Sequence, residues 1–227
     1  MRNVLAGVAM ALACSGAHAR EALPPPAVAS EASAKSLVTV PLANPGFEST
    51  QPGKLGAPDG WWAVQHAGPT SYTFTLDTTS KRSGERSLRI DNVGPEPFGS
   101  LFQRIDALPW RGKTLRLAGW IRTEGTTGNR YGSGAGLNVH AIRGGYSREA
   151  SQMRKNAVHG TTGWTRYEVV LDLSNEAEQI ELGLNLFGPG SAWLDDVTLD
   201  VVERRASTSK PEAAATPDAA RRALPRL

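Results

Sequence analysis

Polar and aromatic side chains alternate with apolar ones in several segments, a pattern that could bind sugars. Asn138 and His140 alternate with apolar neighbours, and Asn185 lies between two leucines. Because successive side chains of a strand point to opposite faces, these polar groups are expected on the solvent faces of their strands. If the strands are neighbours in one sheet, a single hollow surface carries Trp120, Arg122, Asn138, His140 and Asn185, with Trp61, Trp62 and Tyr131 on loops at its edge.

The chemistry of such a surface would be non-covalent recognition. Aromatic rings pack against the C–H faces of a ligand, and a few planar polar groups fix its orientation. Other interpretations stay open. Trp61 follows Asp59-Gly60 at a turn and can instead plug one end of a core. Trp120 faces the core if the alternation is inverted, and His140 can simply be solvated.

The sequence contains none of the common catalytic motifs. It has no G-x-S-x-G turn, which a hydrolase nucleophile needs. His66, His140 and His159 lack the H-E-x-x-H spacing of a zinc protease. The glycine-rich run at 132–136 precedes a strand rather than a helix, so it predicts a hairpin loop and not a phosphate-binding loop.

Carboxylates give no better candidate for catalysis. Glycoside hydrolysis needs two of them about 5 to 9.5 Å apart. Asp195 and Asp196 are adjacent, so in a strand they face opposite sides. No catalytic residue is assigned, and a divergent glycan hydrolase using Glu124 and Glu149 is kept as an alternative.

The elements that must position these residues have a period of two, which indicates β-strands. Turn residues such as Ser83-Gly84 and Gly188-Pro189-Gly190 separate the alternating segments. About eight short strands at this spacing predict an all-β fold, an antiparallel sandwich. The strands are expected within residues 72–76, 87–90, 115–121, 136–142, 165–171, 180–187 and 192–201.

Both ends of the chain differ from this middle part. Residues 1–19 predict a signal peptide, with Arg2, an apolar stretch and Ala17-His18-Ala19 as cleavage region. Residues 20–37 are rich in Ala and Pro and predict a disordered linker, which leaves 38–202 as the folded domain. The only cysteine, Cys14, lies inside the signal, where lipidation is an alternative to its removal. The protein is therefore expected to be exported, to the periplasm or the medium.

Residues 203–227 predict a disordered basic tail. This tail carries six basic and three acidic residues, which equals the whole net charge of +3. The rest of the chain is electrically balanced, which argues against a nucleic-acid-binding domain because such a domain has cations on a folded face. No later apolar segment reaches the roughly 20 residues that span a bilayer, so no transmembrane segment is expected.

Five short motifs, in this order, resemble a known fold family. They are NPGFE at 44–48, PDGW at 58–61, SGERSLRI at 83–90, LRLAGWIRT at 115–123 and AWLDDVTL at 192–199. Together they resemble the galactose-binding-like jelly rolls, especially carbohydrate-binding modules of families 4, 9 and 22. The resemblance implies a jelly-roll β-sandwich whose members bind sugars, bind proteins or serve structural roles.

The resemblance also implies a structural calcium ion. In related modules the ion lies where the first strand, an early loop and the last strand converge. The matching positions are Glu48, the carbonyl oxygen of Lys81, and Asp195 or Asp196. Calcium takes six to eight such oxygen ligands. The alternative is that these carboxylates only accept backbone hydrogen bonds at strand ends.

The expected function is that of an exported, non-catalytic module that binds glycan weakly on a concave sheet face. Its partner would be a glycan. The first alternative is an interaction or structural module that binds an envelope protein and no sugar. The second is the divergent hydrolase.

Overall fold

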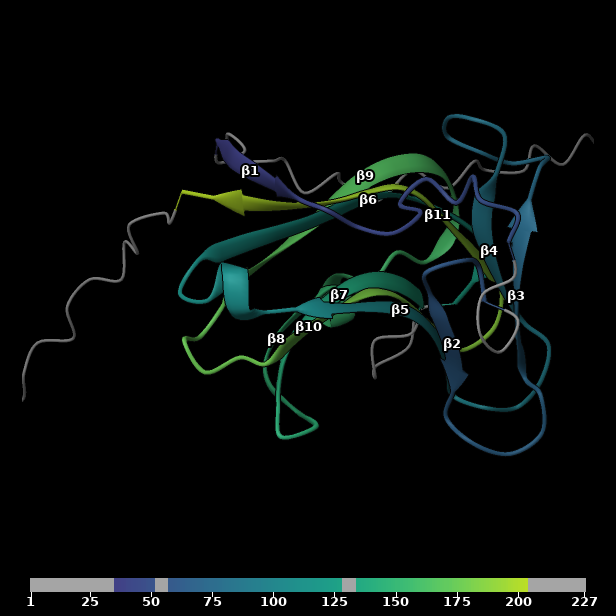
Figure 1. Cartoon of the computed structure of the whole chain (residues 1–227). Helices are drawn as coiled ribbons and strands as arrows, with labels where there is room; N and C mark the ends of the chain where they lie inside the picture. The colour runs from purple at the N-terminus through teal and green to yellow at the C-terminus, as the bar shows by residue number, and fades with distance from the viewer. Residues whose placement is uncertain (1–34, 52–56, 128–133, 204–227) are drawn as a thin grey trace, which may run out of the picture. The chain divides into compact units, whose positions relative to one another are not determined.

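The computed structural model describes residues 35–51, 57–127 and 134–203. Strands dominate this part of the chain. Its helices are two short 3-10 turns, Leu108–Trp110 and Met153–Asn156. The strands form two antiparallel sheets that lie one above the other (Figure 1). The prediction of an all-β, antiparallel jelly-roll sandwich is confirmed.

The first sheet contains both the start and the end of the folded chain. Its path is β3-β4-β11-β6-β9, and β1 pairs with β11 beside it. The first strand therefore pairs antiparallel with the last. The strands are β1 (Ser36–Val40), β3 (Tyr72–Asp77), β4 (Ser87–Asn92), β6 (Thr114–Thr126), β9 (Gly160–Asp172) and β11 (Ser191–Val202).

The second sheet has the order β2-β5-β10-β7-β8, so β10 is its central strand. Its pairing with both neighbours is regular from Gln179 to Phe187. This register places side chains from adjacent strands in rows across the sheet. The strands are β2 (Trp62–Gln65), β5 (Phe98–Asp106), β7 (Gly134–Arg143), β8 (Tyr146–Gln152) and β10 (Gln179–Phe187).

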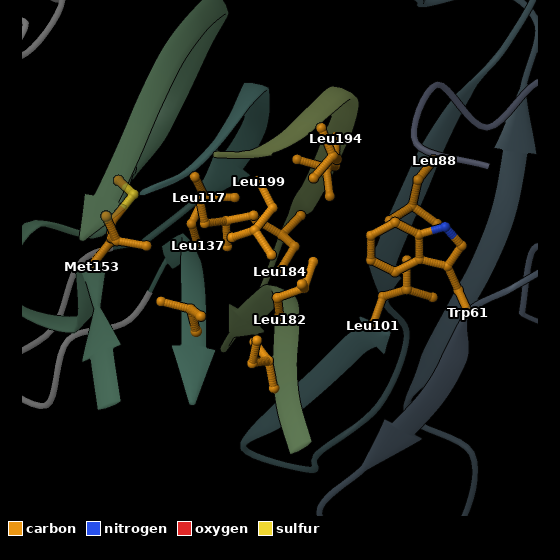
Figure 2. Close-up of a cluster of buried hydrophobic side chains, with 14 of the residues drawn as sticks. Trp61, Leu88, Leu101, Leu117, Leu137, Met153, Leu182, Leu184, Leu194 and Leu199 are labelled. Carbon is orange, nitrogen blue, oxygen red and sulfur yellow. The ribbon is translucent and has the colours of Figure 1, made fainter. Parts of the chain in front are cut away.

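The core lies between the two sheets and is mainly aliphatic. Leu117 and Leu199 face it from the first sheet, and Leu137 and Leu184 from the second (Figure 2). Trp61 lies at one end of this cluster, beside leucines of β4 and β5. Burial of each such aliphatic side chain contributes about 1.5–3 kcal/mol. Every second residue of the long strands is thus held inward, which leaves the others for the outer faces.

The expected strands correspond to β3, β4, β6, β7, β9, β10 and β11, but the important strand β5 was missed. Its inward row is Leu101, Gln103 and Ile105, so a polar residue interrupts the apolar pattern. The Gln103 amide is buried because it bonds the backbone of Ala43 and the carbonyl of Gly60. A buried glutamine satisfied in this way looks like a surface residue in the sequence.

The predictions for the chain ends fall largely outside the described residues. The signal peptide, Cys14, most of the linker and the basic tail belong there. Strand β1 begins at Ser36, slightly before the expected domain start at residue 38, and β11 ends at Val202. In the described ranges, no helix has the length and apolar character to cross a bilayer.

Candidate functional site

The two sheets separate the residues that were expected to share one face. Trp120 and Arg122 lie on β6 in the first sheet, whereas Asn138 and His140 lie on β7, and Asn185 on β10, in the second. The prediction of one common face is therefore wrong. Alternation along a strand shows which side chains share a face of that strand. The sheet that a strand joins depends on pairing with distant parts of the chain.

Arginine side chains cover two tryptophans on the outer face of the first sheet. The Arg82 guanidinium lies 4.2 Å from the ring centroid of Trp120. Arg122 and Arg89 lie 4.2 Å and 4.9 Å from the ring centroid of Trp193. Contacts of this kind contribute about 0.5–2 kcal/mol each. Trp120 and Arg122 thus belong to a stacked surface cluster and do not point toward the second sheet's polar residues.

The same cluster contains a buried carboxylate. The Trp193 indole donates a hydrogen bond to Asp77 Oδ2 over 2.7 Å. Asp77 Oδ1 accepts from the backbone and hydroxyl of Thr79 and from the backbone N–H of Ser80. Burial alone would raise the pKa of Asp77, but these hydrogen bonds outweigh it and hold that pKa well below its usual range. Asp77 is therefore charged near neutrality and anchors Trp193.

The outer face of the second sheet carries a row of aromatic side chains, which we call the aromatic strip: Trp62, Phe98, Phe102 and Phe187. The rings of Trp62 and Phe102 stack with centroids 6.1 Å apart, and those of Phe98 and Phe187 lie 5.7 Å apart. All four are half-buried, whereas the alternate residues of β5 and β10 point into the core. Phe98 and Phe102 are four residues apart on one strand face, about 13 Å.

Sequence reasoning missed three of these four rings, although it named Trp62. A signal was present, because phenylalanines at 98 and 102 flank Ser100 with a period of two. The inward Gln103 obscured it. Register shows that β2 and β5 place Trp62 opposite Phe102, and that β5 and β10 place Phe98 opposite Phe187. Strand pairing therefore assembles the strip from three strands distant in sequence.

Polar side chains accompany the strip on the same face. The Ser100 hydroxyl donates a hydrogen bond to Asn185 Oδ1 between the two aromatic pairs. Arg104 Nη2 lies 2.7 Å from a carboxylate oxygen of Glu181, and the guanidinium lies 5.2 Å from the Phe102 ring centroid. Aromatic surface and oriented polar groups are thus adjacent, which is the composition of a small-molecule binding surface.

One row of this face crosses the whole second sheet, from Trp62 and Phe102 through Gly183 to Asn138 and Gln152. Asn138 is only 4% exposed. Its Nδ2 is buried and has no hydrogen-bond acceptor among the described residues. His140, the next outward residue of β7, is held by Ser147 and Gln152. Burial lowers the pKa of His140, and Glu181 opposes this shift. The row therefore has an aromatic end and an amide end.

Two expected edge residues have different outcomes. Trp61 is 1% exposed, its ring lies 5.2 Å from that of Phe47, and its Nε1 donates to the carbonyl of Asn44. Its predicted place at the edge of a binding surface is wrong, because the turn at Asp59-Gly60 directs the indole into the core. Tyr131 lies outside the described residues.

The residues named for calcium converge on one loop. Asp195 is fully buried, and its Oδ2 accepts hydrogen bonds from the backbone of Arg82 and Ser83. The Glu48 carboxylate accepts hydrogen bonds from the backbone of Glu85 and Arg86. Burial raises the pKa of Asp195, and its hydrogen bonds oppose this shift. The carboxylates thus already bind backbone N–H groups, as the alternative interpretation expected.

The remaining residues of this corner add few ion ligands. The Ser83 hydroxyl donates to Asp196 Oδ1, and Lys81 Nζ donates to the carbonyl of Thr78. In the described ranges, no three His, Cys, Asp or Glu side chains come together as a metal site. An ion bound here would need main-chain oxygens such as the Lys81 carbonyl.

Calcium at this corner remains a proposal, and chelation tests it. EDTA is expected to lower the melting temperature and excess calcium to restore it, because an ion that binds only the folded state stabilises that state. The measurement is differential scanning fluorimetry with magnesium as the control ion. An unchanged melting temperature under EDTA would leave backbone hydrogen bonding as the role of Glu48 and Asp195.

The carboxylates of the hydrolase alternative lie in different sheets. Glu124 is on β6 and forms an ion pair with Arg122. Glu149 is on β8, where it accepts a hydrogen bond from the backbone of Ser174 and lines a pocket of about 200 Å³. This pocket has mixed charge, since Arg143 and Arg148 line it together with Glu149 and Glu176. Each glutamate thus has a local partner of its own.

A known protein resembles this chain in sequence at low identity. No protein-family model matches the chain. Over 147 residues it is 25% identical to an uncharacterised HTH-type transcriptional regulator, YbfP, of Bacillus subtilis (strain 168), which corresponds to 63% of this chain and 48% of the regulator. The chain thus spans about half the length of the curated relative that it matches.

Solved structures give a similar result at low identity. A Stig cyclase, FisC from Fischerella sp. TAU, superposes with a TM-score of 0.50 and 18% identity over 73% of this chain and 99% of the cyclase. A carbohydrate-binding module of family 4 gives 0.49 and 16% over 71% of this chain and 99% of the module. At such identities the likeness concerns the fold. The chain is a jelly-roll β-sandwich with the overall fold of this cyclase.

Proposed function

We propose that this protein is a non-catalytic module that binds glycan weakly through the aromatic strip and the polar groups beside it. The observation that carries this proposal is the row of four half-buried aromatic rings on the outer face of the second sheet. Folding leaves these rings partly exposed on the outer face, although complete burial would stabilise the protein further. Partly exposed aromatic side chains grouped on one face are a feature of ligand-binding surfaces.

The chemistry of the face suits a sugar chain. Trp62 and Phe102 offer stacked rings for the C–H face of a pyranose. Ser100 and Asn185 lie between the two aromatic pairs, where they can meet hydroxyl groups. The side chains beside the strip have partners: Arg104 forms an ion pair with Glu181, and His66 Nδ1 lies 2.9 Å from Glu96 Oε2. Such an open site favours micromolar to millimolar affinity, about −8 to −4 kcal/mol.

Export is the second part of the proposal. Residues 1–19 have the charged start, apolar stretch and small-residue cleavage region of a secretory signal. A module that recognises polysaccharide would meet its ligand in the periplasm or outside the cell. Detection of the processed protein in fractionated cells, with a mature N-terminus at Arg20, tests this part.

Three alanine variants test the binding face. Trp62→Ala and Phe102→Ala are expected to weaken binding at least tenfold, about 1.4 kcal/mol, because each removes a ring on which a sugar would stack. Trp120→Ala is the matched control, because it removes an indole from the outer face of the other sheet. Affinity gel electrophoresis with xylan, β-glucan, galactan and mannan gives the affinities, and melting temperatures confirm folding.

The outcomes separate the two faces. Loss of binding in Trp120→Ala with full binding in Trp62→Ala would move the site to the first sheet. If no polysaccharide binds the wild type and the chain captures a defined envelope protein instead, the glycan proposal is wrong.

A further inference from the structure

We infer that Asn138 and Gln152 read ligand hydroxyls as a donor and acceptor pair, and that His140 is the positioning residue that turns the Gln152 acceptor outward. This inference deepens the proposed function and rests on it. It assigns specificity to the amide end of the row, opposite the aromatic end at Trp62 and Phe102. The three residues come from the adjacent strands β7 and β8.

The donor of the pair is the Asn138 side chain. Asn138 and Gln152 are directly opposite each other across β7 and β8. Asn138 Nδ2 is buried and lacks an acceptor among the described residues. A buried donor left without a hydrogen-bond partner destabilises the folded protein. Asn138 Nδ2 is closed to solvent in the free protein, so a ligand oxygen would accept from it only after the covering groups move aside, and this contact would then remove the destabilisation.

The acceptor of the pair follows from the hydrogen bonds of His140. Its Nε2 lies 2.9 Å from Gln152 Nε2, and its Nδ1 lies 3.0 Å from the Ser147 hydroxyl oxygen. An amide nitrogen only donates, so His140 Nε2 must accept and the ring proton lies on Nδ1. Because the Gln152 nitrogen is bound to the ring, its Oε1 is the atom left for a ligand hydroxyl. Gln152 is exposed, so a ligand can reach it.

The surroundings of His140 favour the neutral ring that this arrangement needs. Glu181 lies across from His140 on β10, and that carboxylate is paired with Arg104 of β5. From β8 the ring meets the neutral Ser147, Ala150 and Gln152. Burial lowers the pKa of His140 from its usual value, and Glu181 counteracts only part of this shift.

Protonation of His140 would reverse the amide. Both ring nitrogens of an imidazolium are donors, so the Gln152 nitrogen could no longer donate to Nε2. The amide would turn its oxygen to the ring and its nitrogen to the ligand. The face then offers two donors in place of a donor and an acceptor. Because burial lowers the pKa of His140, ligand affinity should fall only when the pH drops below the ordinary titration range of histidine.

The test measures affinity against pH for the full chain and three variants. The probe is whichever of the soluble xylan, β-glucan, galactan and mannan the wild type retains most strongly in gels. Wild-type affinity is expected to be about tenfold weaker at pH 4.5 than at pH 8, the loss of about one hydrogen bond. Gln152→Ala should lose about tenfold at pH 8 and have no further pH dependence.

Two histidine variants separate positioning from general effects of acid. His140→Gln keeps an acceptor for Gln152, so it should retain wild-type affinity at pH 8 and lose the pH dependence. His66→Gln is the control, because His66 pairs with Glu96 at the other end of the face and should leave the pH dependence intact. NMR of the His140 ring nitrogens should show the proton on Nδ1 at pH 8.

The failures can be told apart. If no polysaccharide on the panel binds at any pH, the proposed function and this inference both fall. If a polysaccharide binds and Gln152→Ala binds it equally well, the inference alone is overturned. The same holds if wild-type affinity is constant while the NMR signals show that His140 has become protonated.

Discussion

Replacement of Trp61 by alanine is expected to lower the free energy of unfolding by about 3–5 kcal/mol. The Trp61 side chain is 1% exposed and packs against Phe47, with the ring centroids 5.2 Å apart. It fills one end of the space between the sheets, next to Leu88 and Leu101 (Figure 2). Truncation would leave a cavity and would remove the hydrogen bond from Nε1 to the Asn44 carbonyl. Equilibrium unfolding in urea gives the value.

Trp62→Ala is the matched control, because it deletes the same side chain one position further along. Trp62 is half-buried on the outer face and stacks on Phe102. Its replacement should cost no more than about 1.5 kcal/mol of stability, the range of a single aromatic pair. The two substitutions should thus affect different properties: Trp61→Ala lowers stability and Trp62→Ala weakens ligand binding. Equal losses of stability would show that the assignment of the two indoles to core and surface is incorrect.

Gly183→Ala is expected to destabilise the second sheet by about 3 kcal/mol, at the upper end of the range for overpacking. A Cβ atom at Gly183 would lie 1.9 Å from the Leu101 carbonyl oxygen and 2.8 Å from Phe102 Cα. Both atoms are backbone of the paired strand β5, so no side-chain rotation relieves the clash. Strand β10 is central, so the displacement would affect both of its neighbours. Thermal and urea unfolding measure the effect.

Gly163→Ala controls for the loss of a glycine. Gly163 lies in the edge strand β9, and a Cβ atom there would have no heavy atom within 4 Å. This substitution should change stability by no more than about 1 kcal/mol and should be neutral or stabilising, because alanine restricts the unfolded chain. If Gly183→Ala is as stable as Gly163→Ala, then β10 and β5 do not approach as closely as described here.

The faces of individual strands followed from the sequence alone. Asn185 lies between Leu184 and Leu186, and β10 does direct the two leucines into the core and Asn185 outward. The same reasoning placed Asn138 and His140 on one face of β7. It succeeded because the period of a strand is a local property, set by the backbone. The sandwich class followed from the same repeated alternation.

The pairing of the strands could not be predicted from local alternation, because it depends on contacts between distant parts of the chain. Trp120 faces outward from β6 as expected, but β6 pairs with β11 and β9, so this indole lies on the sheet that does not carry Asn138. Trp61 lies in the core, whereas the adjacent Trp62 lies on the outer face. The reason is related, since a turn precedes Trp61 and strand pairing begins at Trp62. Neither outcome is encoded by the local period.

The composition of the candidate site shows the same division. The alternation of residue types was enough to predict the outward polar residues of β7 and β10. Only the tertiary structure brought Phe98 and Phe102 of β5 beside them, through the register of β5 with β10. Gln103 concealed that strand, because its buried amide is satisfied by Ala43 and Gly60, residues about forty to sixty positions away in the chain. Long-range hydrogen bonds and strand register exist only in the folded state, so a local pattern of residue types does not reveal them.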